Sequence, residues 1–248
     1  GDNSTGSSNT AVGHLALKSV TTVDNNTAVG RSAGQEITTG TYNVAMGAYA
    51  LDALTTASDN TAIGYAALTS DITGQGNTAV GKNAAYNNTG SANICIGYDA
   101  MQNAAGVNKC TVVGYQAMYN HSGTGDEGNT HMGYRAGFEG TGGLANTFIG
   151  YQAGYNSKTD FNTAIGWAAL YKIGNSAGGG NGEQNVAIGP GAMAGGDDTV
   201  ANNTGKKNIA IGTSTLGGAT RSTDGDAFTG YENVAIGHNA GTNVSTSY

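Results

Sequence analysis

One short phrase recurs thirteen times along the 248 residues, and each copy ends at a Gly that follows Val, Ile or Met. Most neighbouring copies lie 16 to 19 residues apart, and the last three intervals lengthen to 23, 23 and 25 residues. Such a repeat indicates a stacked architecture, because one unit is too small to bury its own apolar residues. We call these glycines the anchors: Gly13, Gly30, Gly47, Gly64, Gly81, Gly97, Gly114, Gly133, Gly150, Gly166, Gly189, Gly212 and Gly237.

The positions around each anchor are also constrained. The fourth residue before it is Asn in twelve copies, with Cys110 as the exception, and the third residue after it is Ala in every copy but the one with Thr215. Branched residues alternate with small ones before the anchor, which is the period-two pattern of a strand. We therefore predict a strand ending at a Gly corner, a second short strand starting at the following Ala-Leu pair, and a polar turn.

The predicted fold class is all-β: a parallel β-roll or β-solenoid of about thirteen coils. Residues 1–172 are expected to form regular coils of 16 to 19 residues, and residues 173–248 to continue the stack with long inserted turns. A coil of this size has a thin interior, so we expect the Ala- and Gly-rich strand face to pack on a neighbouring subunit. The repeated Asn either bonds from coil to coil as a ladder or caps the backbone of its own turn.

Composition excludes several other classes. The chain has 43 Gly but a single Pro, and Gly does not recur at every third position, which excludes collagen. No apolar stretch approaches the ~20 residues of a membrane-spanning helix, so we expect no membrane insertion. The net charge of −7 and the pI near 4.8 come without a basic patch, so we expect no nucleic-acid partner.

The phrases Asn9-Thr10-Ala11-Val12-Gly13 and Asn60-Thr61-Ala62-Ile63-Gly64 resemble the head repeats of trimeric autotransporter adhesins (YadA-like), which also occur in phage tail fibres and related surface fibres. The resemblance covers essentially the whole chain. It implies a left-handed parallel β-roll, a homotrimer around a threefold axis, and extracellular attachment to a host-surface glycan or receptor. The longer units, and the lack of a neck, stalk or membrane anchor, lead us to expect a virion tail fibre or another surface fibre.

An aromatic column is the main candidate site. The residue directly after the anchor is aromatic in six of seven consecutive copies, and Lys82 interrupts the run. In stacked coils the rings would follow one another at roughly 5 Å per step. The rings either pack on one another to cover the corner, which is the commoner role, or form a stripe that stacks on sugar rings of a glycan. The candidate residues are Tyr65, Tyr98, Tyr115, Tyr134, Tyr151 and Trp167.

Three long turns, 173–184, 194–207 and 217–232, form a second candidate surface. Insertions in repeat proteins often carry binding, although lengthening a surface loop also costs little entropy. Lys206, Lys207 and Arg221 give these turns a modest cationic cluster that would suit an acidic glycan.

No motif indicates catalysis, a metal site or a cofactor, and we expect none. The turn aspartates of 197–198 and 224–226 could bind Ca²⁺, but such residues usually cap the backbone. Cys95 and Cys110 are expected to be free thiols, because two residues along a strand and one coil across separate them by about 8 Å, beyond the ~7 Å limit for a disulfide. The four histidines fall in separate coils and are expected on the surface or in turns.

Three functions are compatible with this sequence. The first, which we favour, is a non-enzymatic trimeric fibre or adhesin segment. The second is a polysaccharide-degrading fibre that uses paired carboxylates between subunits, and release of oligosaccharide from host capsule would indicate it. The third is an ice-binding solenoid with a flat Thr array. Thr occurs three residues before the anchor in only eight of thirteen copies, so that array is interrupted.

Overall fold

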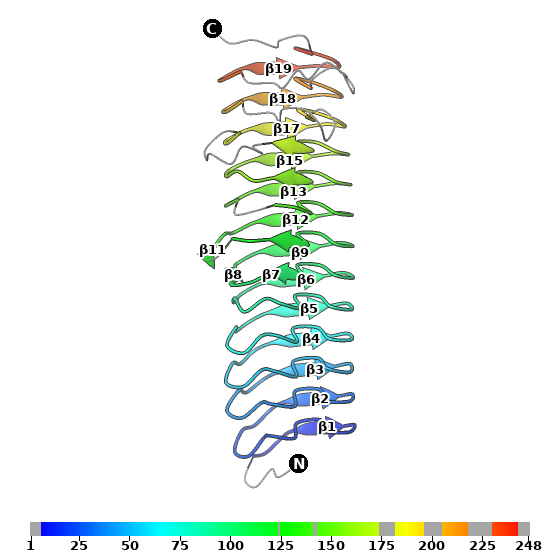
Figure 1. The fold of residues 1–248 in the computed structure, drawn as a ribbon, viewed down its shortest axis with the longest axis vertical. Coiled ribbons are helices and arrows are strands. Elements are labelled where there is room, and N and C mark those ends of the chain that lie inside the picture. The colour runs from blue at the N-terminus through cyan, green and yellow to red at the C-terminus, as the bar shows by residue number, and fades with distance from the viewer. Residues whose placement is uncertain are drawn as a thin grey trace. The chain divides into compact units, whose positions relative to one another are not determined.

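The computed structural model describes residues 6–123, 125–140, 143–173, 182–195, 205–217 and 230–242. These residues form strands and turns, with no helix among them. Every repeat contributes one three-residue strand directly before its anchor Gly (Figure 1). The strands are β1 (Thr10–Val12), β2 (Thr27–Val29), β3 (Val44–Met46), β4 (Thr61–Ile63), β5 (Thr78–Val80), β6 (Ile94–Ile96), β9 (Thr111–Val113), β12 (Thr130–Met132), β13 (Thr147–Ile149), β15 (Thr163–Ile165), β17 (Val186–Ile188), β18 (Ile209–Ile211) and β19 (Val234–Ile236).

The strands divide between two compact units, unit 1 (Gly1–Glu127) and unit 2 (Gly128–Tyr248). Within unit 1, β1 to β6 and β9 pair in chain order, and every pair is parallel. Within unit 2, β12, β13, β15, β17, β18 and β19 do the same. The predicted parallel β-solenoid is confirmed. Equivalent repeat positions lie opposite each other, so each position forms a column along its unit.

In most strands a small middle residue points inward and the branched residues beside it point outward. In β4, Ala62 is 0% exposed, whereas Ile63 beside it is 39% exposed. The same alternation recurs in β2, β13 and β17, where only the middle residue is buried. The expectation that the small face packs on a neighbouring subunit is therefore wrong. Ala is needed inside because larger side chains from the turns fill the space opposite it.

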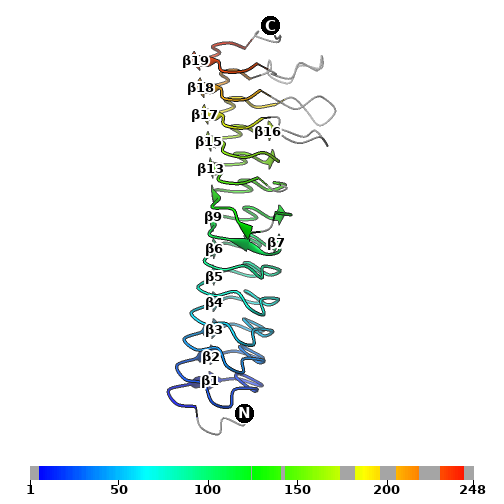
Figure 2. The ribbon, with the colours of Figure 1, turned by 90° about the vertical axis from the view of Figure 1, so that its left-hand side faces the viewer.

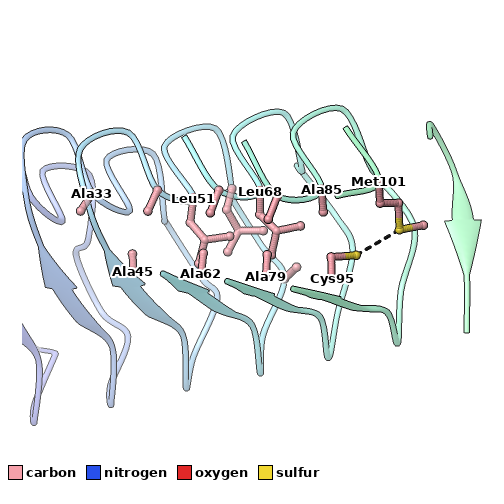
Figure 3. Close-up of a cluster of buried hydrophobic side chains, with 14 of the residues drawn as sticks. Ala33, Ala45, Leu51, Ala62, Leu68, Ala79, Ala85, Cys95 and Met101 are labelled. Atoms are coloured by element: carbon pink, nitrogen blue, oxygen red, sulfur yellow. Dashed lines mark hydrogen bonds between the residues drawn. The ribbon is translucent and has the colours of Figure 1, made fainter. Parts of the chain in front are cut away.

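The interior of unit 1 shows this division. Leu51, Leu68 and Met101 project from the turns, and alanines such as Ala45 and Ala79 meet them from the strands (Figure 3). All three large side chains are fully buried. The coils of these three residues thus hold one or two large apolar side chains each, as their length predicts, and stacking makes their burial continuous.

Both cysteines belong to this interior. Cys95 and Cys110 are free and buried, which confirms the expectation of two free thiols. Cys95 takes the place of the strand Ala, and its Sγ lies 3.1 Å from Met101 Sδ (Figure 3). Burial raises the pKa of the Cys95 thiol, so the reactive thiolate is disfavoured.

The second strand predicted at the Ala-Leu pair does not form. Residues two and four after the anchor have left-handed backbone, as in Ala66 (φ 53°) and Leu68 (φ 51°), and this interrupts an extended conformation. Backbone bonds still join the coils there, since Leu51 N donates to Ala67 O at 3.1 Å. Short parallel pairs form farther along the turns (Figure 2): β7 (Asn103–Ala104) with β10 (Asn120–His121), β8 (Val107–Asn108) with β11 (Gly125–Asp126), and β14 (Asn156–Ser157) with β16 (Lys172–Ile173).

The anchor position requires Gly for two reasons. At Gly47 the backbone has φ 136°, which L side chains rarely adopt. A Cβ on Gly47 would also lie 2.3 Å from Gly64 O in the next coil. Backbone therefore stacks directly on backbone at the corner, and any side chain there would force the coils apart.

The Asn column bonds the coils through the backbone rather than mainly amide to amide. Asn26 Oδ1 accepts the N–H of Asn43 at 3.0 Å, and Asn43 Oδ1 accepts the N–H of Asn60 at 3.1 Å. Asn43 Nδ2 donates to Ala57 O at 2.9 Å, in the turn that leads to the next strand. Each buried amide is therefore a rung of a ladder between coils. Some also bond the backbone of their own turn, since Asn26 Nδ2 donates to Asp24 O at 3.3 Å, so both interpretations hold in part. Leaving such buried groups unbonded would cost about 1–3 kcal/mol each.

Candidate attachment surface

The outward face of the sheet is a strip of uncharged side chains. It consists of the residues one and three positions before each anchor, which are Val, Ile, Met or Thr in every coil. In unit 1, Ile63, Ile94 and Ile96 are among its exposed members, and Ile165 and Ile236 are exposed in unit 2. The row directly before the anchors is Val, Ile or Met in every coil, and proteins rarely expose a large contiguous apolar row unless something binds it.

The aromatic column forms as predicted, with exposed rings after the anchors. In unit 1, the rings of Tyr98 and Tyr115 stack at 5.2 Å with 7° between their planes. In unit 2, Tyr134 and Tyr151 stack at 5.0 Å and 7°, and Trp167 follows Tyr151 at 6.5 Å and 10°. The rings therefore pack on one another, as the structural interpretation expects. Because stacked partners cover each other's faces, a ligand would meet mainly ring edges and hydroxyl groups.

Lys82 occupies the gap in the unit 1 column. Its Nζ lies 5.9 Å from the ring centroid of Tyr65 and 5.4 Å from that of Tyr98. Both contacts fall within the cation–π range, so the ammonium group takes the place of the missing ring. On its other side, Tyr65 meets Tyr49 edge-on, with the ring centroids 5.8 Å apart.

Unit 2 carries a second aromatic column that the sequence analysis missed. Phe138, Tyr155 and Tyr171 lie five residues after their anchors and stack at 5.1 and 5.0 Å. The guanidinium of Arg135 lies 5.2 Å from the Tyr134 ring centroid and 4.9 Å from that of Phe138, so it connects the two columns. Aligning the repeats at that fifth position would have revealed the second column.

The candidate cations of the long turns are only partly described. Lys206 Nζ lies 3.8 Å from Glu183 Oε2, and Lys207 Nζ lies 3.3 Å from Glu232 Oε1. Both ammonium groups therefore have a carboxylate partner from the neighbouring coil. Arg221, residues 197–198 and residues 224–226 lie outside the described residues.

Two histidines lie in the interior, contrary to the expectation of surface or turn positions. His121 is buried, and its Nε2 lies beside Oε2 of the buried Glu127 in unit 1. His131 takes the place of a strand Ala in unit 2, where it stacks on Phe148 with ring centroids 4.8 Å apart. The described residues hold no group of three His, Cys, Asp or Glu side chains that could bind a metal ion.

A scan against protein-family models, a search of curated proteins and a search of solved structures all give no match. Among the described residues, no helix is long and apolar enough to cross a membrane.

Proposed function

We propose that this chain is a non-enzymatic segment of a homotrimeric extracellular fibre or adhesin, such as a virion tail fibre, that mediates attachment to a host-surface glycan or receptor. The observation that carries the proposal is the uncharged outward face of the sheet. In the trimer, three left-handed rolls lie side by side with these faces toward the axis, and the aromatic columns provide the binding surface.

The outward face suits a second copy of the same chain. At about 4.8 Å per strand, the seven strands of unit 1 give a strip roughly 30 Å long. The strip repeats with the period of the coils, and only another stack with that period can match it coil for coil. Oligomers of identical chains usually close by rotational symmetry, and three copies around one axis would bury each strip.

Solution mass tests the trimer. Sedimentation equilibrium of the full chain should give three times the mass of 24.7 kDa. Replacing Ile63 and Ile96 together by Lys should yield monomers, because two buried charges per copy would lack partners. Thr38→Lys, at an exposed turn residue, serves as the control and should leave the trimer intact. A monomeric wild-type chain would contradict the proposal.

Glycan binding is tested on the aromatic columns. Tyr115→Ala and Tyr134→Ala should weaken binding to host-surface glycans while the remaining fold is retained, as read by circular dichroism. Incubation with host capsule should release no oligosaccharide. Release would contradict the non-enzymatic assignment and favour a polysaccharide-degrading fibre. Unchanged glycan binding in the folded Tyr115→Ala and Tyr134→Ala variants would show that the aromatic columns are not the binding surface.

Ice binding is the second candidate, and the outward direction of the strand Thr residues favours it. Thr61 and Thr78 lie on the same outward face as Ile63 and Val80, directly across from each other in register. A flat face of Thr and branched residues could order water. Thermal hysteresis in the wild-type chain, lost on Thr61→Lys, would support this candidate, and its absence would exclude it.

A further inference from the structure

In unit 1 the aromatic column is interrupted between Tyr65 and Tyr98, where Lys82 follows the anchor Gly81 in place of an aromatic residue. Tyr98 and Tyr115 cover each other's faces, whereas the faces of Tyr65 and Tyr98 that look toward each other are separated by the coil of Lys82. Two coil steps separate Tyr65 from Tyr98, about 10 Å at standard strand spacing. Van der Waals contact needs only about 3.5–4 Å on each side. Between Tyr65 and Tyr98 the column therefore has the ammonium group of Lys82 where a third ring would otherwise lie.

Lys82 also differs from the cations of the long turns. Lys206 and Lys207 each have a carboxylate partner, whereas within the described residues no carboxylate lies at ion-pair distance from Lys82 Nζ. Asp99, in the coil after Lys82, is buried and accepts a hydrogen bond from Asn83 Nδ2 at 3.0 Å. Its carboxylate is thereby directed to Asn83, and the exposed ammonium of Lys82 is available to an anion from solution.

We infer that Lys82, with Tyr65 and Tyr98, forms a subsite for the carboxylate of an acidic sugar, such as a uronic or sialic acid. The carboxylate accepts from the Lys82 ammonium, and C–H groups of the sugar contact the outer edges of the two flanking rings. The cation–π contacts hold the ammonium in place before the ligand arrives, which lowers the ordering cost of binding. This inference rests on the proposed glycan attachment and assigns its ligand class.

A single exposed ion pair contributes little, so one subsite binds weakly. Repetition of the subsite on three copies would raise the avidity for a polymer without any new contact, because each later binding event is intramolecular. The contribution of the charge should also fall as salt concentration rises, since exposed charges are screened over about 10 Å at 0.1 M.

The test compares a uronic acid oligomer with its own neutral form. Tetragalacturonate and its methyl ester are titrated into the full chain by calorimetry at low and high salt, with 3′-sialyllactose and lactose as a second acidic and neutral pair. The acids should bind, and the neutral partners should bind up to about fivefold more weakly. Lys82→Gln should lose that preference, Lys82→Arg should keep it, and Lys18→Gln, at an exposed residue elsewhere in unit 1, should not alter it.

Lys82→Tyr separates charge from stacking. This variant closes the gap with a ring, so it keeps the column but removes the ammonium. Loss of acid binding in Lys82→Tyr supports the subsite. Equal binding of acids and neutral forms, or acid binding that survives in Lys82→Tyr, overturns it while leaving glycan attachment by the columns intact. Failure of the wild-type chain to bind any glycan would contradict both this inference and the proposed glycan attachment.

Discussion

Two coils of unit 2 are filled in the opposite way from the coil of Ala62 and Leu68 in unit 1, whereas other unit 2 coils, such as that of Ala164 and Leu170, match unit 1. In unit 1, the strand residue Ala62 is small and Leu68 from the turn is large, and both are fully buried. In unit 2, Phe148 takes the strand position and Gly154 takes the turn position, where a Cβ would lie 2.4 Å from the Phe148 ring. His131 and Gly137 repeat the exchange, with a corresponding distance of 2.3 Å. Either wall of a coil can therefore supply its large interior side chain, and the position opposite is then small.

The largest expected effect comes from removing the large residue of the unit 2 coil. Phe148→Ala leaves Ala opposite Gly154, so no side chain fills the interior. We expect a loss of about 3–5 kcal/mol in the free energy of unfolding, measured by chemical denaturation. Gly154 cannot shift a side chain into the space, because it has none. A loss below about 1 kcal/mol would show that Phe148 is not the side chain that fills the interior of its coil.

The exchange itself can be reversed in a double variant. Gly154→Leu alone should destabilise by about 1–3 kcal/mol through overpacking against Phe148. Adding Gly154→Leu to Phe148→Ala should instead stabilise that variant, since it recreates the pair seen in Ala62 and Leu68. A double-mutant cycle measures this coupling. Additive losses would mean that the two positions do not share one volume.

Asp71 breaks the apolar pattern within unit 1. It occupies the column of the buried Leu54, and burial raises the pKa of its carboxyl to about 6 although Gly74 N, Thr73 N and Asn77 Nδ2 donate to it. The folded state thus holds the proton more tightly than the unfolded state, whose value is near 3.8. Stability should therefore fall as pH rises through the window from about 4 to about 6.

Replacing the carboxyl by an amide tests this pH dependence. Asn88, one coil later in the same column, already accepts a backbone N–H from Gly90, so Asp71→Asn preserves the geometry. We expect Asp71→Asn to be about 2–3 kcal/mol more stable than the wild-type chain at pH 7 and equal to it below pH 4. Denaturation curves at pH 3.5, 5 and 7 measure the difference. A difference that does not vary with pH would contradict the raised pKa.

The smallest expected effect concerns the aromatic columns, which are interrupted in unit 1 and continuous in unit 2. Lys82→Tyr would make the unit 1 column continuous. We expect a gain of about 0.5–1.5 kcal/mol from the new ring contacts, reduced by the lost cation–π contacts. Thermal unfolding followed by near-ultraviolet dichroism reports on these rings. A clear loss of stability would show that the ammonium fits the gap better than a ring does.

Local residue patterns predicted the strands of both units well. Alternating branched and small residues located every three-residue strand, and the repeat length predicted the parallel stack. The same patterns placed a second strand at Ala67-Leu68 and missed the left-handed backbone there. Propensity gives little warning at such positions, because Ala66 and Leu68 adopt φ 53° and 51° without being glycines. The coil imposes that backbone, since its short turn must close in the space of a few residues.

The candidate surface was only partly predicted from the alignment of the repeats. The aromatic column follows from one fixed position after the anchor, so the alignment of repeats was enough to find it. The Phe138, Tyr155 and Tyr171 column was equally visible and was overlooked. The interior positions of His121 and His131 were not predictable from their spacing, because they depend on contacts with the buried Glu127 and with the Phe148 ring.

The sequence by itself determined the repeat, the parallel stacking and the positions of the anchors, the Asn ladder and the rings. These features depend only on the residues within one coil and on the repetition of those residues in the next coil. Only the tertiary structure decided which strand face is buried and which is exposed. An alternating strand has two faces of different size, and the choice between them depends on what lies across the interior, where Leu51 and Leu68 leave space for Ala alone.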